Sequence, residues 1–192
     1  GLTDTLTGLS MLLFRSTLCI HYAKHERMTF VDTKDMRRHG NDFMQQYPVV
    51  LSTTFSARSC IFTDKPFDYI IMDEASQVSI DTGALALTCA TNAVIVGDTL
   101  QLPNVVTDED RLKLDAVMKQ YNIAEGYDCA KYSFLQSVME VISNVPETLL
   151  REHYRCHPRI INFCNQKFYG GNLLIMTEDK GEEDVLTAIR TV

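Results

Sequence analysis

Apolar and polar positions alternate along much of the chain with the period of amphipathic helices. Residues 5–25 predict a first helix, because their leucines and one isoleucine recur near helical spacing. Residues 33–46 predict a second helix, which is polar and partly basic and which Pro48 ends. The pattern predicts further helices over residues 79–90, 108–124, 131–143 and 158–168.

Short apolar runs of strand length separate these helices. They cover residues 49–53, 67–72 and 93–96, and residues 147–150 and 185–192 predict two further strands. Such runs, alternating with helices, are typical of a parallel sheet whose strands are buried on both faces. We therefore predict an α/β fold, with a boundary between two α/β units near residues 143–150.

Acidic residues follow two of the predicted strands. Asp73 and Glu74 come directly after residues 67–72, and Asp98 follows residues 93–96. Because ligands bind beyond the carboxyl ends of parallel strands, we expect the three carboxylates to share one edge. One carboxylate of such a pair can hold Mg²⁺ through water while the other polarises an attacking water. An acidic turn is also an ordinary feature after a strand, so the pair alone leaves both interpretations open.

Two further polar residues stand where they can meet a phosphate. Gln101 lies between Asp98 and Pro103, and a glutamine can sense a phosphate or orient a water without adding charge. Arg155 lies between a predicted strand and a helix, from where a guanidinium can reach phosphate oxygens across a cleft. A surface loop and a surface ion pair explain the two residues equally well when each is taken alone.

Composition and charge narrow the class of protein. The chain is 45% hydrophobic and 22% charged, as in an ordinary globular protein, and no run of 18 apolar residues predicts a membrane span. The net charge of −7 disfavours simple nucleic-acid binding, but its distribution is uneven. Residues 66–146 hold four Lys or Arg against twelve Asp or Glu. We expect a cytoplasmic or nucleoid-associated protein with no membrane partner.

The six cysteines include no CxxC pair, which favours reduced, buried thiols. A zinc site is the minor alternative, because two cysteines and two histidines lie close in sequence without the usual ligand-pair spacing. Its ligands would be His153, Cys156, His157 and Cys164.

The motifs, and the order in which they follow one another, resemble those of the superfamily 1B helicases, in the branch related to the nonsense-mediated-decay RNA helicase. DEASQ at 73–77 resembles motif II, and GDTLQLP at 97–103 resembles motif III. YRCHP at 154–158 resembles motif IV, and LSTTFSA at 51–57 resembles a short motif that lies by the nucleic-acid strand in the family. The resemblance covers residues 49–175.

The resemblance implies a P-loop NTPase with a RecA-like parallel sheet and ATP and Mg²⁺ as cofactors. Residues 1–146 would form the C-terminal part of the first RecA-like motor domain, and residues 147–192 the beginning of the second. The implied activity is ATP hydrolysis coupled to 5′-to-3′ movement on single-stranded DNA or RNA.

The resemblance also implies roles at the nucleotide. Asp73 would coordinate Mg²⁺ through water, Glu74 would be the catalytic base, and Gln77 would support the site. Gln101 would contact the γ-phosphate, and Arg155 would touch it from the second motor domain.

Five more positions complete the implied site. Gly97 and Asp98 would lie at the nucleotide, and Thr53, Thr54 and Pro103 along the nucleic-acid strand. Two positions depart from the family pattern, which usually has a second proline where this chain has Asn104 and a glutamine where it has His153. The departures leave the detail of the strand-coupling loop open.

The sequence contains no G-x-x-x-x-G-K-[ST] motif to cradle phosphates, and it lacks both an initiator methionine and the family's later arginine motif. We therefore expect a piece of a longer protein that is inactive in isolation. An incomplete sheet has an exposed edge, which predicts self-association. The alternatives are a non-catalytic helicase-like module that binds nucleic acid or a partner, and a metal phosphohydrolase using Asp73, Glu74 and Asp98.

Overall fold

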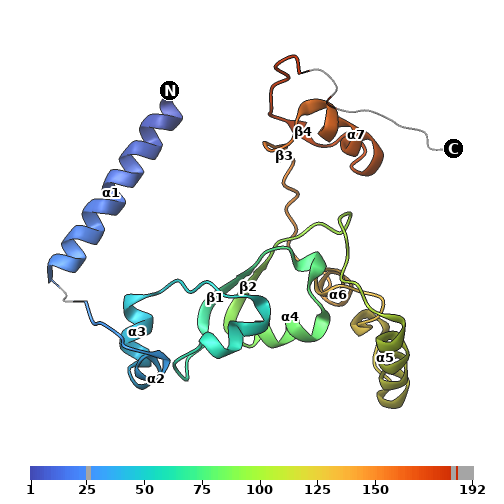
Figure 1. Ribbon diagram of the computed structural model, residues 1–192, viewed down its shortest axis with the longest axis horizontal. Helices are drawn as coiled ribbons and strands as arrows, with labels where there is room; N and C mark the ends of the chain where they lie inside the picture. The colour runs from blue at the N-terminus through green and yellow to red at the C-terminus, as the bar shows by residue number, and fades with distance from the viewer. Residues whose placement is uncertain (25–26, 183–184, 186–192) are drawn as a thin grey trace.

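The computed structural model describes residues 1–24, 27–182 and 185. Helix α1 (Leu2–Lys24) projects as a rod beyond one end of a central body, and a small C-terminal unit stands above the other end (Figure 1). This unit holds β3 (Glu152–His153), α7 (Pro158–Phe168) and β4 (Leu174–Ile175). The body contains one parallel sheet, and the C-terminal unit contains a second. The predicted α/β fold with a parallel sheet is therefore confirmed.

The body is built on two neighbouring parallel strands. Strand β1 (Phe67–Met72) pairs with β2 (Ala90–Ile95) through a register that ends with Met72 opposite Ile95. Helix α4 (Ile80–Leu87) connects them. The prediction of strands at 67–72 and 93–96 is confirmed, although β2 begins three residues before the predicted run.

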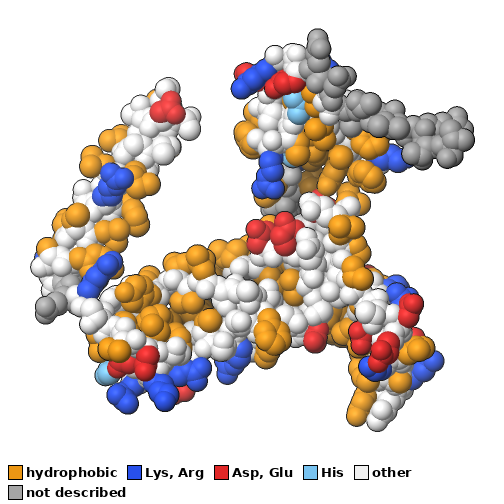
Figure 2. Space-filling model, in the orientation of Figure 1, with side chains coloured by type: hydrophobic (Ala, Val, Ile, Leu, Met, Phe, Trp, Pro, Cys, Tyr) orange, Lys and Arg blue, Asp and Glu red, His pale blue; other side chains and the backbone are white. Residues whose placement is uncertain are grey.

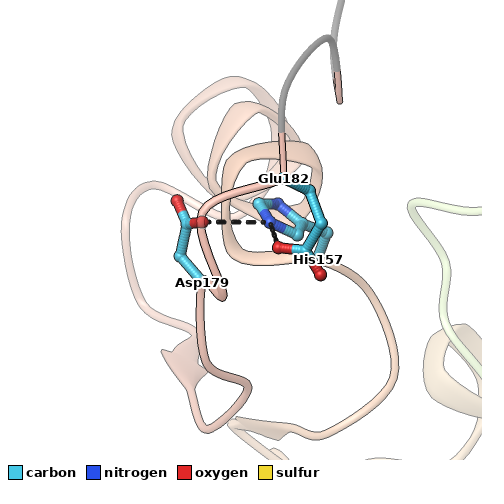
Figure 3. Close-up of side chains that lie close together, drawn as sticks. All are labelled: His157, Asp179 and Glu182. Carbon is cyan, nitrogen blue, oxygen red and sulfur yellow. Dashed lines mark hydrogen bonds and ion pairs between the residues drawn. The ribbon is translucent and has the colours of Figure 1, made fainter.

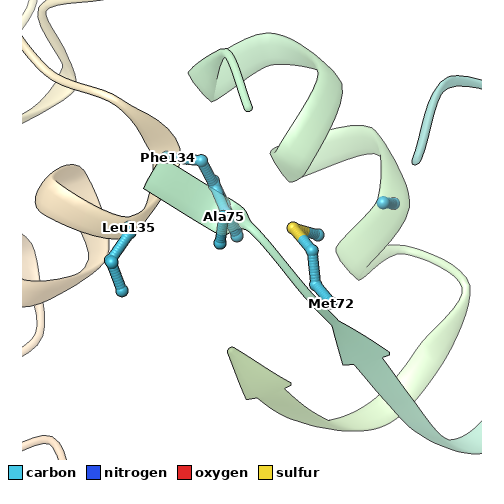
Figure 4. Close-up of a cluster of buried hydrophobic side chains, with 5 residues drawn as sticks. Met72, Ala75, Phe134 and Leu135 are labelled. Atoms are coloured by element: carbon cyan, nitrogen blue, oxygen red, sulfur yellow. The ribbon is translucent and has the colours of Figure 1, made fainter. Parts of the chain in front are cut away.

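Helix α6 (Phe134–Val141) closes the core of the body. It begins with a capping box formed by Ser133 and Gln136. It packs against α4 at Gly83, where a Cβ would lie 2.3 Å from the Phe134 ring, so only glycine allows this approach. The buried core cluster consists of Met72, Ala75, Ala86, Phe134 and Leu135 (Figure 4).

The other face of the β1–β2 sheet is bare. Alternate residues of the strands point away from the core cluster, and Ile71 is 72% exposed while its neighbour Val94 is also exposed. The prediction that the strands are buried on both faces is therefore wrong for the described chain. Apolar runs identify a strand, but they do not show that an element covers each face.

The predicted helix at 33–46 is divided in two. Helix α2 (Thr33–Arg38) ends at His39, and α3 (Gly40–Gln46) begins with the next residue. Gly40 lies so close to Phe62 that a Cβ would be 1.9 Å from the Phe62 carbonyl oxygen. The chain therefore bends at His39 to bring Gly40 against the loop that precedes β1.

Two predicted strands do not form. Residues 49–53 pair with neither sheet, and Leu51 is 93% exposed. Instead, this stretch leads into the 3-10 helix η1 (Thr54–Cys60). Residues 147–150 lack regular structure too, and most of the predicted strand at 185–192 lies outside the described residues. Apolar composition permits a strand, but a strand forms only where a partner supplies backbone hydrogen bonds.

The C-terminal unit is small and follows a linker without regular structure. Strand β3 (Glu152–His153) pairs in parallel with β4 (Leu174–Ile175). Helix α7 (Pro158–Phe168) lies between them, as predicted, and Gly170 and Gly171 follow it with φ of 58° and 79°. The domain ranges 1–146 and 147–192 stay predictions.

The remaining helices contribute one residue, Ala75, to the core cluster. Helix α5 (Asp108–Tyr121) is confirmed, and the short 3-10 helices η2 (Ala75–Gln77) and η3 (Glu125–Tyr127) flank the packed region. All six cysteines are free, but only Cys89 is buried, so the expectation of buried thiols holds for one of them. Among the described helices, none combines the length and the apolar character that a bilayer crossing requires.

Candidate functional site

The predicted carboxylates lie at one edge of the sheet. Because β1 and β2 are parallel and Met72 pairs with Ile95, the residues that follow each strand emerge at the same edge. Two backbone hydrogen bonds continue this contact, from Val96 to the Met72 carbonyl and from Ala75 to the Val96 carbonyl (2.8 and 2.9 Å). Acidic side chains also gather on the side of the body that faces the C-terminal unit (Figure 2).

A sharp turn presents the first two carboxylates. Glu74 has a φ of 53°, a left-handed conformation that few non-glycine residues adopt, and it turns the chain from β1 into η2. Its backbone N–H donates to Asp73 Oδ1 at 2.9 Å, and Gln77 Nε2 lies 3.4 Å from Glu74 Oε2. Ala75 is fully buried beneath the turn. The carboxylates of Asp73 and Glu74 are thus exposed on a turn that the buried side chain of Ala75 fixes to the core.

The loop that follows β2, residues 97–104, is called the second loop, and it packs directly on the turn at Glu74. A Cβ at Gly97 would lie 3.1 Å from the backbone nitrogens of both Ala75 and Ser76, so a larger residue would push the two loops apart. Farther along, the Asn104 N–H donates to the Ser76 carbonyl at 3.1 Å. Gly97 therefore keeps the two predicted nucleotide-binding loops in contact.

Asp98 organises the second loop through both of its carboxylate oxygens. Oδ1 accepts the Leu100 N–H at 2.9 Å, and Oδ2 accepts from Gln101 Nε2 at 3.2 Å. Partial burial disfavours the charged form, but hydrogen bonds from Tyr169, Leu100 and Gln101 outweigh it and lower the pKa of Asp98. Asp98 therefore stays ionised and holds the side chain of Gln101.

Tyr169 is a residue of this site to which the sequence assigned no role. Its hydroxyl donates to Asp98 Oδ2 at 2.5 Å, although 71 positions separate the two residues. This hydrogen bond, with burial adding to it, raises the pKa of Tyr169 to about 12. No local sequence signal predicts the contact, because it depends on how the C-terminal unit sits against the body.

Arg155 lies apart from these carboxylates. It is exposed in the loop between β3 and α7, where the neighbouring Cys156 N–H donates to His153 Nε2 at 2.8 Å. Within the described part of the chain, its guanidinium makes no hydrogen bond or ion pair. The structure thus unites Glu74 with Gln77 and Asp98 with Gln101, whereas Arg155 does not reach them.

The residues predicted to follow the nucleic-acid strand lie on exposed loops. Thr53 caps η1, since its Oγ1 accepts the Ser56 N–H at 3.3 Å, and Thr54 is half-buried. Pro103 is exposed on the second loop. Phe55, to which no role was predicted from the sequence, is 81% exposed beside the two threonines. An exposed aromatic ring there offers a surface on which a base can stack.

The zinc alternative does not fit the histidines. His153 Nε2 accepts the Cys156 N–H, and His157 Nδ1 accepts the Arg159 N–H at 3.2 Å. His157 Nε2 instead faces Asp179 and Glu182, at 3.4 and 3.3 Å (Figure 3). Because Nδ1 accepts a hydrogen bond, Nε2 carries the proton of the neutral ring and donates to these carboxylates. The cluster therefore fastens the loop at 179–182 to the start of α7.

The phosphohydrolase alternative is also disfavoured. It requires Asp98 as a third metal-binding carboxylate beside Asp73 and Glu74. Both oxygens of Asp98 already accept hydrogen bonds from within the chain, and Tyr169 adds a second bond to Oδ2. The donor set that remains is the Asp73–Glu74 pair.

Comparisons with known proteins agree with the motifs. The AAA domain family matches residues 20–109. The chain is 28% identical over 151 residues to the DNA replication ATP-dependent helicase/nuclease Dna2 of Schizosaccharomyces pombe, which covers 78% of this chain and 9% of that protein. It is 27% identical over 154 residues to an uncharacterised ATP-dependent helicase of Mycoplasma genitalium, covering 78% of this chain and 13% of that protein.

A third relative extends the agreement to vertebrates. The chain is 30% identical over 126 residues to the helicase/nuclease Dna2 of Gallus gallus, covering 66% of this chain and 11% of that protein. The chain thus spans between 9% and 13% of the length of these relatives. The ordered motifs, the parallel sheet and these similarities agree, and together they support a helicase-like segment of the superfamily 1 type.

Proposed function

We propose that this segment supplies the Mg-ATP edge of a motor that hydrolyses ATP to move along single-stranded DNA or RNA. The observation that supports it most is the shared edge at which the Asp73–Glu74 turn and the Asp98–Gln101 loop pack together. The relatives are ATP-dependent helicases by name, which agrees with this activity. In the proposal, residues 1–146 belong to the first motor domain and residues 147–192 begin the second.

The donor set at the turn fits Mg²⁺. Asp73 is exposed at a strand tip, and only one of its oxygens accepts a hydrogen bond within the described chain. Hard carboxylate oxygen is the ligand type that Mg²⁺ prefers, and Asp73 would hold the ion through water. When bound, Mg²⁺ neutralises charge on the phosphates of ATP.

The other residues divide the work of hydrolysis. Glu74 would take a proton from the attacking water, while Gln77 restrains its carboxylate. Gln101, whose Nε2 donates to Asp98 Oδ2 at 3.2 Å in this structure, would contact the γ-phosphate. Arg155, which has no ion pair to break within the described residues, would approach the same phosphate from the second motor domain.

The nucleic-acid strand would pass over the exposed loops of the body. Thr53, Thr54 and Pro103 supply polar and apolar contacts to its backbone and sugars, and Phe55 supplies a ring for stacking. In this arrangement, Asp98 and Gln101 lie in the same loop as Pro103, so a change at the γ-phosphate can reach the strand over a few residues.

Strand separation by the full-length protein tests the proposed function. Partial duplexes with either a 5′ or a 3′ single-stranded tail are incubated with the protein and Mg-ATP. We expect unwinding of the 5′-tailed duplex with ATP and none with a non-hydrolysable analogue. Unwinding that proceeds equally with the analogue would contradict an ATP-driven motor.

We expect the 192-residue chain by itself to show no ATP turnover. Its sequence contains no glycine-rich motif followed by Lys and Ser or Thr, so no backbone cradle holds the β- and γ-phosphates near Glu74. The measurement is phosphate release by the purified chain. Release that disappears in the Glu74→Gln variant would show that the chain is active without such a motif.

We also expect the isolated chain to self-associate. The bare face of the β1–β2 sheet exposes Tyr69, Ile71 and Val94, and each strand has one unpaired edge in the described sheet. Light scattering at rising concentration should show dimers or larger species, and Ile71→Lys should reduce them. A wild-type chain that stays a monodisperse monomer would refute this expectation.

A further inference from the structure

One hydrogen bond joins the two halves of the molecule at the candidate site. Tyr169 belongs to the C-terminal unit, and its hydroxyl donates to Asp98 Oδ2 in the body at 2.5 Å. Residues 142–151, which connect the two parts, have no regular structure. The Tyr169–Asp98 hydrogen bond therefore forms only when the C-terminal unit lies against the body. Its presence or absence changes the surroundings of Asp98 in the second loop.

Tyr169 is held firmly within its own unit. It ends α7, and its backbone N–H donates to the Asn165 carbonyl at 3.1 Å. The buried Asn165 side chain in turn bonds both backbone groups of Leu173, at 3.2 and 3.0 Å. A displacement of the unit therefore carries the Tyr169 hydroxyl with it.

The same carboxylate oxygen serves a second donor. Asp98 Oδ2 accepts from the Tyr169 hydroxyl and also from Gln101 Nε2, at 3.2 Å. A short O–H···O⁻ bond is about twice as strong as a bond between neutral groups, so it draws on the charge that also holds Gln101. When the Tyr169 hydrogen bond is lost, Gln101 Nε2 is the one remaining donor to Asp98 Oδ2 among the described residues.

We propose that Tyr169 is a positioning residue that sets the side chain of Gln101 through their shared acceptor, Asp98 Oδ2. With Tyr169 in place, the Gln101 amide is loosely held and free to meet a phosphate. When the C-terminal unit moves away, Asp98 binds the amide more tightly and withdraws it. The consequence for turnover rests on the proposed function of Gln101, whereas the hydrogen-bond relay does not.

The relay is tested first in the chain itself, without any activity. The side-chain amide resonances of ¹⁵N-labelled glutamine are compared between wild type, Tyr169→Phe and Tyr154→Phe. Tyr154 is a matched control, because its hydroxyl donates to Glu152 within the C-terminal unit. We expect the Gln101 amide to shift in Tyr169→Phe and to stay in place in Tyr154→Phe. An unchanged Gln101 amide in Tyr169→Phe would overturn the relay.

Tyrosine labelled with ¹³C at Cζ provides an independent measure of the contact. The Tyr169 phenol should ionise above the ordinary tyrosine range in the wild type, because it donates to a carboxylate. In Asp98→Asn, its titration should return toward that range. A Tyr169 titration that is the same in both proteins would show that the bond does not form, and this also overturns the proposal.

The full-length protein tests the effect on turnover. Tyr169→Phe should lower the kcat of strand-stimulated ATP hydrolysis about tenfold with KM for ATP unchanged, the loss expected from one hydrogen bond to a charged group. Tyr121→Phe on α5 is the control and should leave kcat unchanged. A measurable ATPase whose kcat is the same in Tyr169→Phe overturns the positioning role. If the wild type shows no turnover, the proposed function has failed, and the resonance experiments alone decide the relay.

Discussion

Replacing Glu74 with glutamine in the full-length protein should lower strand-stimulated ATP turnover by about a thousandfold, the usual contribution of a general base. The amide keeps the size of the side chain on its left-handed turn but cannot take a proton from water. Neighbouring Asp73 is unchanged, so ATP binding should persist. The measurement is steady-state phosphate release together with the Kd for ATP.

The matched control for this variant is Glu140→Gln. Glu140 is an exposed glutamate near the end of α6, away from the strand tips, so its loss changes net charge equally. Turnover in this control should equal that of the wild type. If Glu74→Gln keeps turnover near the wild-type rate, another group takes the proton, and the assignment of Glu74 is wrong.

Replacing Arg155 with alanine should lower kcat by about a thousandfold in the full-length protein, as for arginines that stabilise charge on a transferred phosphoryl group. In the described chain, its guanidinium is exposed and has no carboxylate partner, so its loss removes no ion pair of the fold. The melting temperature should therefore stay close to that of the wild type while single-turnover hydrolysis slows.

Arg159→Ala provides the comparison for this arginine. Arg159 lies four residues away on α7, but its Nε donates to Asp179 at 3.0 Å, so it is already engaged. Its removal should leave kcat within about twofold, because an exposed ion pair contributes little. Equal losses of kcat in the two variants would mean that general charge, and not the position of Arg155, determines the effect.

Helices and the site edge could be predicted from the sequence because their signals are local. Helix α7 begins at Pro158 and ends before Gly170 as expected, since both residues restrict the backbone directly. Likewise, two strands that each end in acidic residues must place them at one edge once the strands are parallel. The shared position of Asp73 and Asp98 therefore required no tertiary detail.

The errors concern features that depend on a distant partner. Residues 49–53 and 147–150 have the composition of strands, but among the residues that the structure describes neither has a neighbouring strand to complete its hydrogen bonds. The break at His39 follows from the close approach of Gly40 to Phe62, which no periodicity reveals. These features are set by packing between segments that lie far apart in sequence.

Tyr169 is the most informative of these omissions. It closes an ordinary amphipathic helix, and nothing in its immediate sequence distinguishes it from a solvated tyrosine. Only the placement of the C-terminal unit brings its hydroxyl to Asp98. A residue that couples two units is hard to find from sequence for this reason, because its function belongs to the arrangement and not to the motif.

The central claim is that this segment forms the catalytic edge of an ATPase that single-stranded nucleic acid stimulates. The most direct measurement is ATP turnover by the full-length protein, with Mg²⁺, in the presence and absence of single-stranded DNA or RNA. We predict that either single-stranded DNA or single-stranded RNA strongly stimulates ATP turnover. Nucleotide binding without turnover on either strand would contradict the claim and would identify a non-catalytic helicase-like module.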